Sequence, residues 1–116
     1  MKNLKMYYDN ANSMVSIVYS TMGNVETARK IARVLVEKKL VACVNIIPRI
    51  ESIYRWKGSV ETDNECILIA KTVDKNVENT IQKIQELHPY DLPDIISFPI
   101  VKGLKEYLDY IEDETK

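Results

Sequence analysis

Few residues in this chain offer the imidazole or thiolate ligands that soft metal ions prefer. His88 is the only histidine, and the two cysteines, Cys43 and Cys66, stand inside apolar runs with no C-x-x-C spacing. Imidazole nitrogen and thiolate sulfur are ligands that copper and similar cations prefer. The sequence therefore indicates His88 and Cys43 as candidate metal ligands. Two alternatives stay open, because a histidine followed by proline can order a turn and a cysteine flanked by alanine and valine is typical of a packed core.

An aromatic pair stands in a segment that reads as extended. Tyr54 and Trp56 are two positions apart, so their side chains are predicted to lie on one side, with Arg55 and Lys57 on the other. We expect the two aromatic residues to anchor a subunit interface or to line a cleft between subunits, although packing inside one subunit is the alternative. Tyr90, in a turn rich in proline, is expected to line the same cleft.

The sequence contains no recognisable catalytic arrangement. Ser20 and Thr21 follow a predicted strand, but neither a G-x-S-x-G motif nor a glycine-rich phosphate loop surrounds them. The basic, glycine-rich loop that acylphosphatases use after their first strand is also missing from residues 20–24. Glu61, Asp91 and Asp94 are possible oxygen ligands for a hard cation, yet carboxylates near turns are commonplace. We therefore expect a binding protein and not an enzyme.

The spacing of apolar residues predicts the elements that must position these side chains. Continuous apolar or β-branched runs indicate strands, and apolar residues that recur every three or four positions indicate helices. Strands are expected over residues 15–19, 41–57 with a break at Pro48, 65–72 and 95–100, and helices over 24–39, 74–88 and about 104–111. Asn24 and Asp74 are the predicted N-caps, and Gly58-Ser59 the turn of a long hairpin. The order βαββαβ with a short C-terminal helix is typical of a ferredoxin-like α+β sandwich.

In several predicted strands, the side chains that point to either face of the sheet are apolar. The two main helices alone cannot cover both faces. Helices on one side of a sheet cover only one of its faces. In the second strand the two sets are Val41, Cys43 and Ile47 against Ala42, Val44 and Ile46. Because large exposed apolar faces usually mark interfaces, we expect further copies of the chain to cover the second face. The C-terminal helix covering part of it is the alternative.

Length and composition indicate one domain, over residues 15–116, after a polar N-terminal extension over residues 1–14. The 116 residues carry 16 basic and 17 acidic side chains, and the basic ones are scattered, so no nucleic-acid partner is expected. The longest apolar run, residues 40–47, is far shorter than the roughly 20 residues of a membrane helix. Free thiols and the lack of an apolar leader favour the cytoplasm.

Three segments resemble the CutA family of divalent-cation tolerance proteins. They are LVACVNIIP at residues 40–48, SIYRWKG at 52–58 and LHPYDLPDII at 87–96, and the resemblance extends over about residues 15–111. It implies a non-catalytic homotrimer with an architecture similar to PII signalling proteins, in which the long hairpin reaches a neighbour. It also implies a role in the response to metal ions, with copper or another divalent cation as ligand and no organic cofactor.

The resemblance further implies where a metal would bind. The metal site proposed for the family combines a cysteine at the end of the first strand with two adjacent histidines, and the matching positions here are Ser20, Leu87 and His88. Since only the histidine at 88 is retained, weak binding is expected. The alternative function is a PII-like sensor of a small anionic metabolite or nucleotide, with positive charge from Arg49, Arg55 and Lys57.

Overall fold

The computed structural model describes residues 7–9 and 14–116. Its elements are, in chain order, β1 (Tyr7–Asp9), β2 (Val15–Met22), α1 (Val25–Glu37), β3 (Cys43–Trp56), β4 (Ser59–Val73), a 3-10 turn (Asp74–Asn76), α2 (Val77–Leu87), β5 (Ile95–Pro99), β6 (Lys102–Leu104) and α3 (Lys105–Glu114). Residues 1–6 and 10–13 of the expected polar extension lie outside the described residues. Residues 7–9, which belong to the same extension, form a strand that the sequence did not predict.

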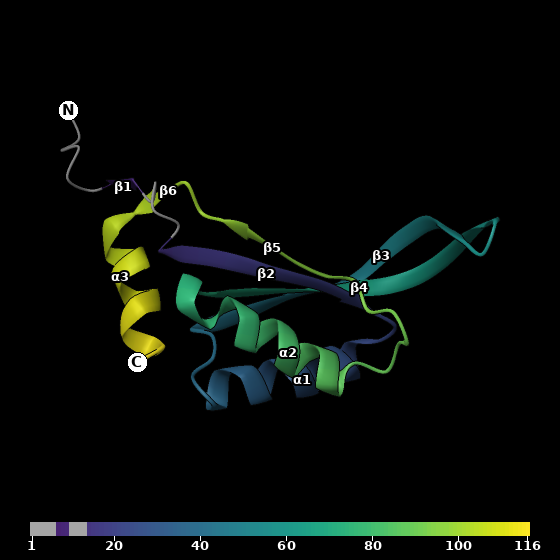
Figure 1. Cartoon of the computed structure of the whole chain (residues 1–116), viewed down its shortest axis with the longest axis horizontal. Helices are drawn as coiled ribbons and strands as arrows, with labels where there is room; N and C mark the ends of the chain where they lie inside the picture. The colour runs from purple at the N-terminus through teal and green to yellow at the C-terminus, as the bar shows by residue number, and fades with distance from the viewer. Residues whose placement is uncertain (1–6, 10–13) are drawn as a thin grey trace.

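Four strands form one antiparallel sheet in the order β3-β4-β2-β5. β2 lies inside the sheet, where Tyr19 pairs with Ile69 of β4 and with Ile96 of β5. α1 and α2 cover one face of this sheet, and α3 lies at its far end from the hairpin (Figure 1). The predicted ferredoxin-like α+β sandwich is thereby confirmed.

The main core lies between the sheet and the two covering helices. Alternate residues of β2 and β4 point toward these helices, as strand geometry requires. The fully enclosed cluster contains Val18, Met22, Ala28, Ile31, Leu35, Val41, Cys66, Leu68, Ala70 and Ile84. Burying a valine, leucine, isoleucine or methionine side chain contributes about 1.5–3 kcal/mol, so the larger members of this cluster stabilise the packing of α1 and α2 on the sheet.

The two covering helices begin in different ways. The side-chain oxygen of Asn24 accepts the N–H of Thr27 (2.8 Å), which confirms the predicted cap of α1. Asp74 instead lies in the 3-10 turn, its N–H donates to the carbonyl of Met14, and Asn76 precedes α2 without a side-chain capping bond. The prediction that Asp74 caps the second helix is therefore wrong, because a tight turn separates the strand from the helix.

β3 and β4 continue past the sheet as a two-stranded arm (Figure 1). Their pairing shifts between Ile47 and Ile50, so the residues around Pro48 form a bulge. A proline has no N–H to donate to a neighbouring strand, and a bulge is where a strand tolerates this. The expected break at Pro48 is thus a bulge within one long strand. β4 is also longer than predicted, because it begins at Ser59.

The arm ends in a two-residue turn. Lys57 and Gly58 both have positive φ angles, 49° and 82°, and Trp56 pairs with Ser59. Two positive φ angles at the centre of a hairpin are typical of a type I′ turn, whose twist matches that of the strands. The turn therefore lies one residue earlier than the predicted Gly58-Ser59.

α3 covers one end of the sheet face that α1 and α2 leave open. Leu108 and Ile111 pack there with Val15, Ala42 and Val73 in a second, smaller core. β6, directly before α3, pairs with β1 in a separate two-stranded sheet. The C-terminal helix is therefore part of the domain, and it covers part of the second face as the alternative prediction had it.

Candidate binding site

The turn after α2 is held by both ring nitrogens of His88. Nδ1 accepts the N–H of Tyr90 (3.1 Å), and Nε2 lies 2.8 Å from the carbonyl oxygen of Thr21 on β2. Because Nδ1 is an acceptor, the ring hydrogen belongs on Nε2, which donates to Thr21. The side chain is 7% exposed, and the Tyr90 ring packs against it edge-on at 4.7 Å. In this chain His88 thus connects the turn to the sheet.

The residues that match the family's proposed metal site do not form a set of three ligands. Ser20 is fully buried on the helix-covered face with no hydrogen-bond partner for its hydroxyl, whereas Leu87 is 42% exposed. A metal ion could reach His88 only if one of its two hydrogen bonds were broken. Within the described part of the chain, no group of three or more His, Cys, Asp or Glu side chains is placed to hold a metal ion.

Cys43 lies far from His88 along the sheet. It begins the edge strand β3, pairs with Lys71 and is only half-buried, while His88 is joined to Thr21, which pairs with Ile67. Lys71 and Ile67 are four residues apart on one strand, or about 13 Å. The two candidate ligands thus belong to different ends of the sheet. Both cysteines are free, as expected, but only Cys66 is fully buried.

Two phenols and two carboxylates meet where the arm leaves the sheet. Tyr54 donates to Asp63 across the arm, and the Tyr90 hydroxyl donates to Glu65 (3.0 Å) two residues further along β4. The hydrogen bond to Asp63 raises the pKa of Tyr54 to about 12. Burial, and then the bond to Glu65, raise the pKa of Tyr90 to about 12. Tyr54 and Tyr90 are therefore neutral hydrogen-bond donors beside a row of negative charge.

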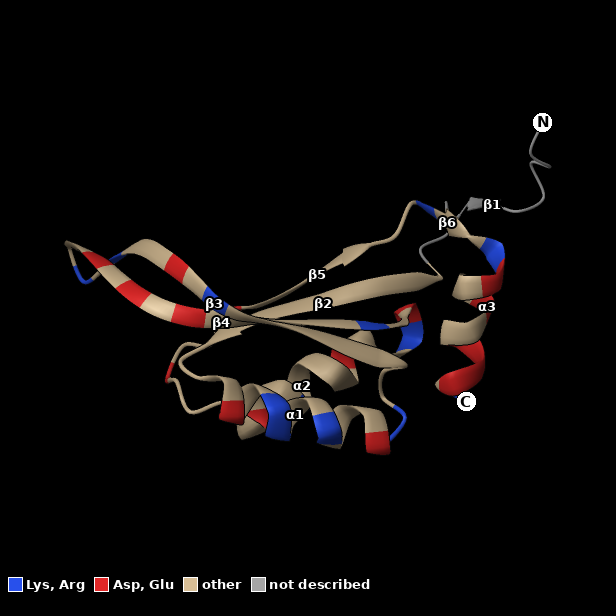
Figure 2. Ribbon diagram, turned by 180° about the vertical axis from the view of Figure 1, so that it is seen from behind, with Lys and Arg blue, Asp and Glu red and all other residues tan. Residues whose placement is uncertain are grey.

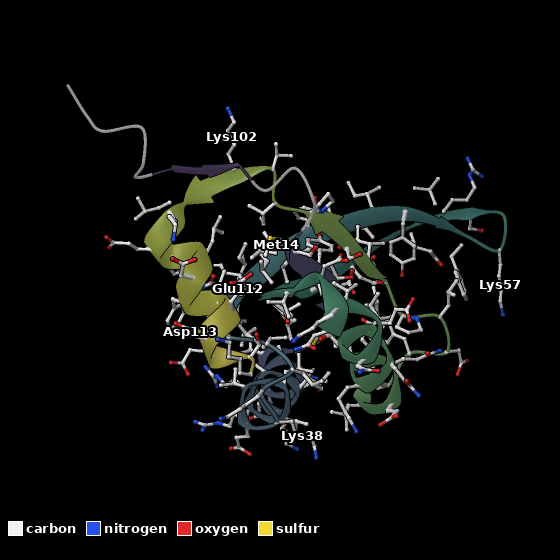
Figure 3. The ribbon with its side chains drawn as sticks, turned by 60° about the vertical axis from the view of Figure 1, so that its left-hand side comes forward. Met14, Lys38, Lys57, Lys102, Glu112 and Asp113 are labelled. Atoms are coloured by element: carbon white, nitrogen blue, oxygen red, sulfur yellow. The ribbon has the colours of Figure 1, made fainter. Side chains whose placement is uncertain are left out.

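Trp56 lies nearer the tip of the arm than this phenol pair. It is 42% exposed, and Nζ of Lys57 lies 5.8 Å from the centre of its ring. Figure 3 shows Lys57 at the far end of the arm. Arg55 pairs with Val60 and points to the opposite face, as predicted. The predicted position of Lys57 opposite Trp56 is wrong, because the positive φ angle in the turn brings its side chain back over the indole.

The sequence reasoning missed the acidic row that binds the phenols. Glu61, Asp63 and Glu65 occupy every second position of β4 and so share one face of the arm with Tyr54. Figure 2 shows these acidic residues as red segments along the arm. Acidic residues at every second position could have been recognised as one face of a strand. That interpretation needed the predicted strand, which began at Glu65, to begin at Ser59 instead. Of the other predicted oxygen ligands, Asp94 accepts a hydrogen bond from Thr21 (3.3 Å) and Asp91 is exposed.

The open face of the sheet carries large apolar side chains beyond the end that α3 covers. Residues of β2 that alternate with the core positions lie on this face, as do their cross-strand partners. The members are Ile17, Tyr19, Ile47, Ile67, Ile69, Ile96 and Phe98. Ile96 is 54% and Phe98 44% exposed. We refer to these seven residues as the open apolar face.

The fold and these surfaces define a class of protein. It is a ferredoxin-like domain whose β3–β4 hairpin projects as a long arm and whose sheet has one face with exposed apolar side chains. Residues 16–114 match the family described as the CutA1 divalent ion tolerance protein. The chain belongs to this family.

Relatives from distant organisms agree with this assignment. The divalent-cation tolerance protein CutA of Thermus thermophilus is 43% identical over 102 residues, which cover 88% of this chain and 99% of that protein. The chloroplastic CutA of Arabidopsis thaliana is 41% identical over 86% of this chain, but the match spans only 55% of its length. The solved structure of the periplasmic divalent cation tolerance protein CutA from Archaeoglobus fulgidus has a TM-score of 0.86 and 38% identity, and the match covers 89% of this chain and 100% of that one.

A helix needs about 20 mostly apolar residues to cross the hydrocarbon core of a bilayer. Within residues 7–9 and 14–116, none of them is long and apolar enough to cross a membrane.

Proposed function

We propose that this chain acts as a non-catalytic homotrimer in the cytoplasm that binds copper or another divalent metal ion in the clefts between its subunits. Membership of the divalent ion tolerance family supports the metal-related role. The observation that carries the assembly is the open apolar face, whose side chains α3 leaves exposed. Two further copies of the chain are its proposed occupants.

The arm supports the same assembly. A two-stranded ribbon is at best marginally stable in water, and this one has apolar groups on both sides. Trp56 lies on the side of Tyr54, whereas Ile53 and Val60, 65% and 64% exposed, lie on the other. An arm with this composition gains stability when it packs against a neighbouring subunit. Tyr54, Trp56 and Tyr90 are then residues of the interface or of the cleft beside it.

We assign the metal to the cleft at the His88 turn and not to Cys43. The ammonium group of Lys71 lies beside Cys43 and repels a cation there. At the turn, Nε2 of His88 would have to release the Thr21 carbonyl before it could bind a metal, and that loss offsets part of the binding energy. Among residues 7–9 and 14–116 no group of three or more His, Cys, Asp or Glu side chains is placed to hold a metal ion, so we expect binding to be weak.

Calorimetric titration with copper tests this assignment. The wild-type trimer should bind copper weakly, His88→Gln should lose most of this binding, and Cys43→Ser should keep it. Tight binding that survives His88→Gln would contradict the assignment, and tight binding lost with Cys43→Ser would move the site to the thiol.

A PII-like sensor of a small anionic metabolite or nucleotide remains a second candidate, because the arm tip combines a cation with an aromatic ring. The Lys57 ammonium over Trp56 could pair with a phosphate while the indole stacks on a base. Titration with a panel of nucleotides, in parallel with copper, separates the two functions. Nucleotide binding lost in Lys57→Gln would favour the sensor.

A further inference from the structure

A groove between the end of α1 and α2 has no part in the proposed function. The two helices lie side by side on the sheet (Figure 1). The groove has a volume of about 490 Å³, and small-molecule sites in proteins usually measure roughly 300–1,000 Å³. Its lining consists of Lys38, Leu40, Asn79, Gln82, Lys83 and Glu86. We call it the helix groove.

One face of α2 supplies most of this lining. Asn79, Gln82, Lys83 and Glu86 are spaced by three or four residues, so their side chains lie in one row along the helix. Every member of this row is polar. Lys38, from the end of α1, adds a second ammonium group to the lining. The two helices thus meet here through hydrogen-bonding groups and not through an apolar contact.

Most of these hydrogen-bonding groups have no partner within the chain. In the described residues, the side chains of Lys38, Asn79 and Gln82 form no hydrogen bond or ion pair. An ammonium group offers three N–H donors, and each amide offers two. The helix groove therefore gathers free donors from two helices in one place, which suits a ligand that is rich in acceptor oxygens.

The charge of the lining also favours an anion. Glu86 is its single carboxylate, and Nζ of Lys83 lies 2.8 Å from an oxygen of this group. The Lys83 side chain is 28% exposed and that of Glu86 51%, so the cation is the more enclosed partner. Two ammonium groups against one carboxylate leave the helix groove with one net positive charge.

The ends of the two helices do not oppose an anion here. Free carbonyl groups at the end of a helix repel negative charge, but the N–H groups of residues 38–41 donate to the carbonyls of Val34, Leu35 and Val36 (3.0–3.4 Å). Asn79 lies in the first turn of α2, where the helix dipole is positive. Both helix ends are thus compatible with negative charge in the groove.

We propose that the helix groove binds a small organic phosphate. The phosphoryl group lies between Lys38 and Lys83, because lysine binds phosphate as a point charge. It takes the place of Glu86 as the partner of Lys83. The hydroxyl groups of the ligand bind the amides of Asn79 and Gln82.

Titration of the folded, full-length protein with ribose 5-phosphate tests the proposal. Backbone amide shifts in nuclear magnetic resonance spectra report the place of binding, and their dependence on concentration gives the dissociation constant. We expect saturable shifts at residues 38–40 and 79–86, weaker binding of inorganic phosphate, and none of ribose. No shifts in these segments at millimolar ribose 5-phosphate would overturn the proposal, and so would equal affinities for ribose 5-phosphate and inorganic phosphate.

Variants of the two lysines test the site itself. Lys38→Gln and Lys83→Gln should each weaken the binding of ribose 5-phosphate by about tenfold, as expected when a hydrogen bond to a charged group is lost. Lys75→Gln removes the same charge from the 3-10 turn outside the groove and should have little effect. Equal affinities in the three variants would contradict the proposal, because the attraction would then be unspecific.

The glutamate of the groove gives a test of opposite sign. Glu86→Gln releases Lys83 and should tighten binding by about two- to fivefold, the equivalent of one exposed ion pair. Glu78→Gln changes the net charge equally at a position of α2 outside the groove and should leave the affinity unchanged. Weaker binding in Glu86→Gln would contradict the proposal.

The helix groove shares no residue with the arm tip or with the His88 turn. Lys57→Gln and His88→Gln should therefore leave the binding of ribose 5-phosphate unchanged. A loss in Lys57→Gln would place this ligand at the arm tip and overturn the proposal. Copper titration has no bearing on the groove, so the proposed function and this proposal can fail separately.

Discussion

His88 shows how a histidine can be fully engaged without any metal. One ring nitrogen accepts the N–H of Tyr90 and the other donates to Thr21, so the imidazole connects the turn after α2 to the first strand of the sheet. A metal ion could bind this ring only by displacing one of these two hydrogen bonds. The same residue is thus a candidate ligand by its chemistry and a structural residue by its contacts.

Replacement of this ring should cost stability. His88→Ala leaves the buried carbonyl of Thr21 and the partly buried N–H of Tyr90 without the partners that the imidazole provides, so we expect a loss of about 2–3 kcal/mol in the free energy of unfolding. Urea unfolding at one fixed protein concentration measures it. Leu87→Ala, at the exposed neighbouring position, is the matched control and should cost far less. Equal losses in the two variants would show that the two hydrogen bonds contribute little.

The raised pKa of Tyr90 predicts how the stability of the folded chain changes at alkaline pH. Its pKa is raised from 10.0 to about 12 by burial and by the bond to Glu65, so the folded chain keeps a proton that the unfolded chain loses. This group contributes stability below about pH 10, and the contribution is lost as the pH rises toward 12.

Ultraviolet titration of the phenols, as the difference between wild type and Tyr90→Phe, checks the shift. Glu65→Gln should lower the pH at which Tyr90 ionises, and Glu78→Gln on α2 should not. A Tyr90 that ionises near pH 10 in the folded protein would contradict the assigned contacts.

The arm is the element on which assembly is expected to depend most. Trp56 and Tyr54 share one face of a ribbon that has little core of its own. If Trp56 is an anchor in a neighbouring subunit, Trp56→Ala should weaken assembly by about 2 kcal/mol or more. Dilution of the protein, followed by mass photometry, gives the dissociation constant for each variant. Thr62→Ala on the opposite face of the arm is the control, and an unchanged constant for Trp56→Ala would place this indole outside the interface.

The order and type of the main elements could be predicted from the sequence, because apolar periodicity is strong in β2, α1 and α2. The bulge at Pro48 and the extension of β4 back to Ser59 could not, since a charged, exposed ribbon has no apolar alternation that separates a strand from a loop. Both features depend on how β3 and β4 pair with each other. Within the described residues, β1 and β6 escaped prediction for the same reason, because each has three residues and depends on the other.

The candidate site was predictable in part. His88 and Tyr90 stand in a recognisable turn, and the sequence suggested correctly that the histidine could order it. Their partners Thr21 and Glu65 are distant along the chain, and only the register of β2 and β4 brings them near. The contact between Cys43 and Tyr107 likewise depends on where α3 packs, which no local pattern specifies.

The whole molecule has an elongated form with two surfaces that a single chain leaves uncovered. Its extent of 51 Å along the longest axis reflects the projecting arm (Figure 1). The open apolar face lies on the sheet from which this arm extends. An arm and an apolar face on one chain allow each copy to give the arm to one neighbour and receive one from another. Closed rings of this kind have cyclic symmetry and leave neither surface exposed.

The molar mass of the protein in solution shows whether three copies of the chain assemble. Light scattering at micromolar concentration should give three times the 13.4 kDa mass of the chain. Phe98→Asp, which places a charge on the open apolar face, should reduce the mass toward that of one chain, whereas Glu78→Gln on the outer surface of α2 should leave it unchanged. A wild-type protein that is monomeric at this concentration would contradict the proposed trimer.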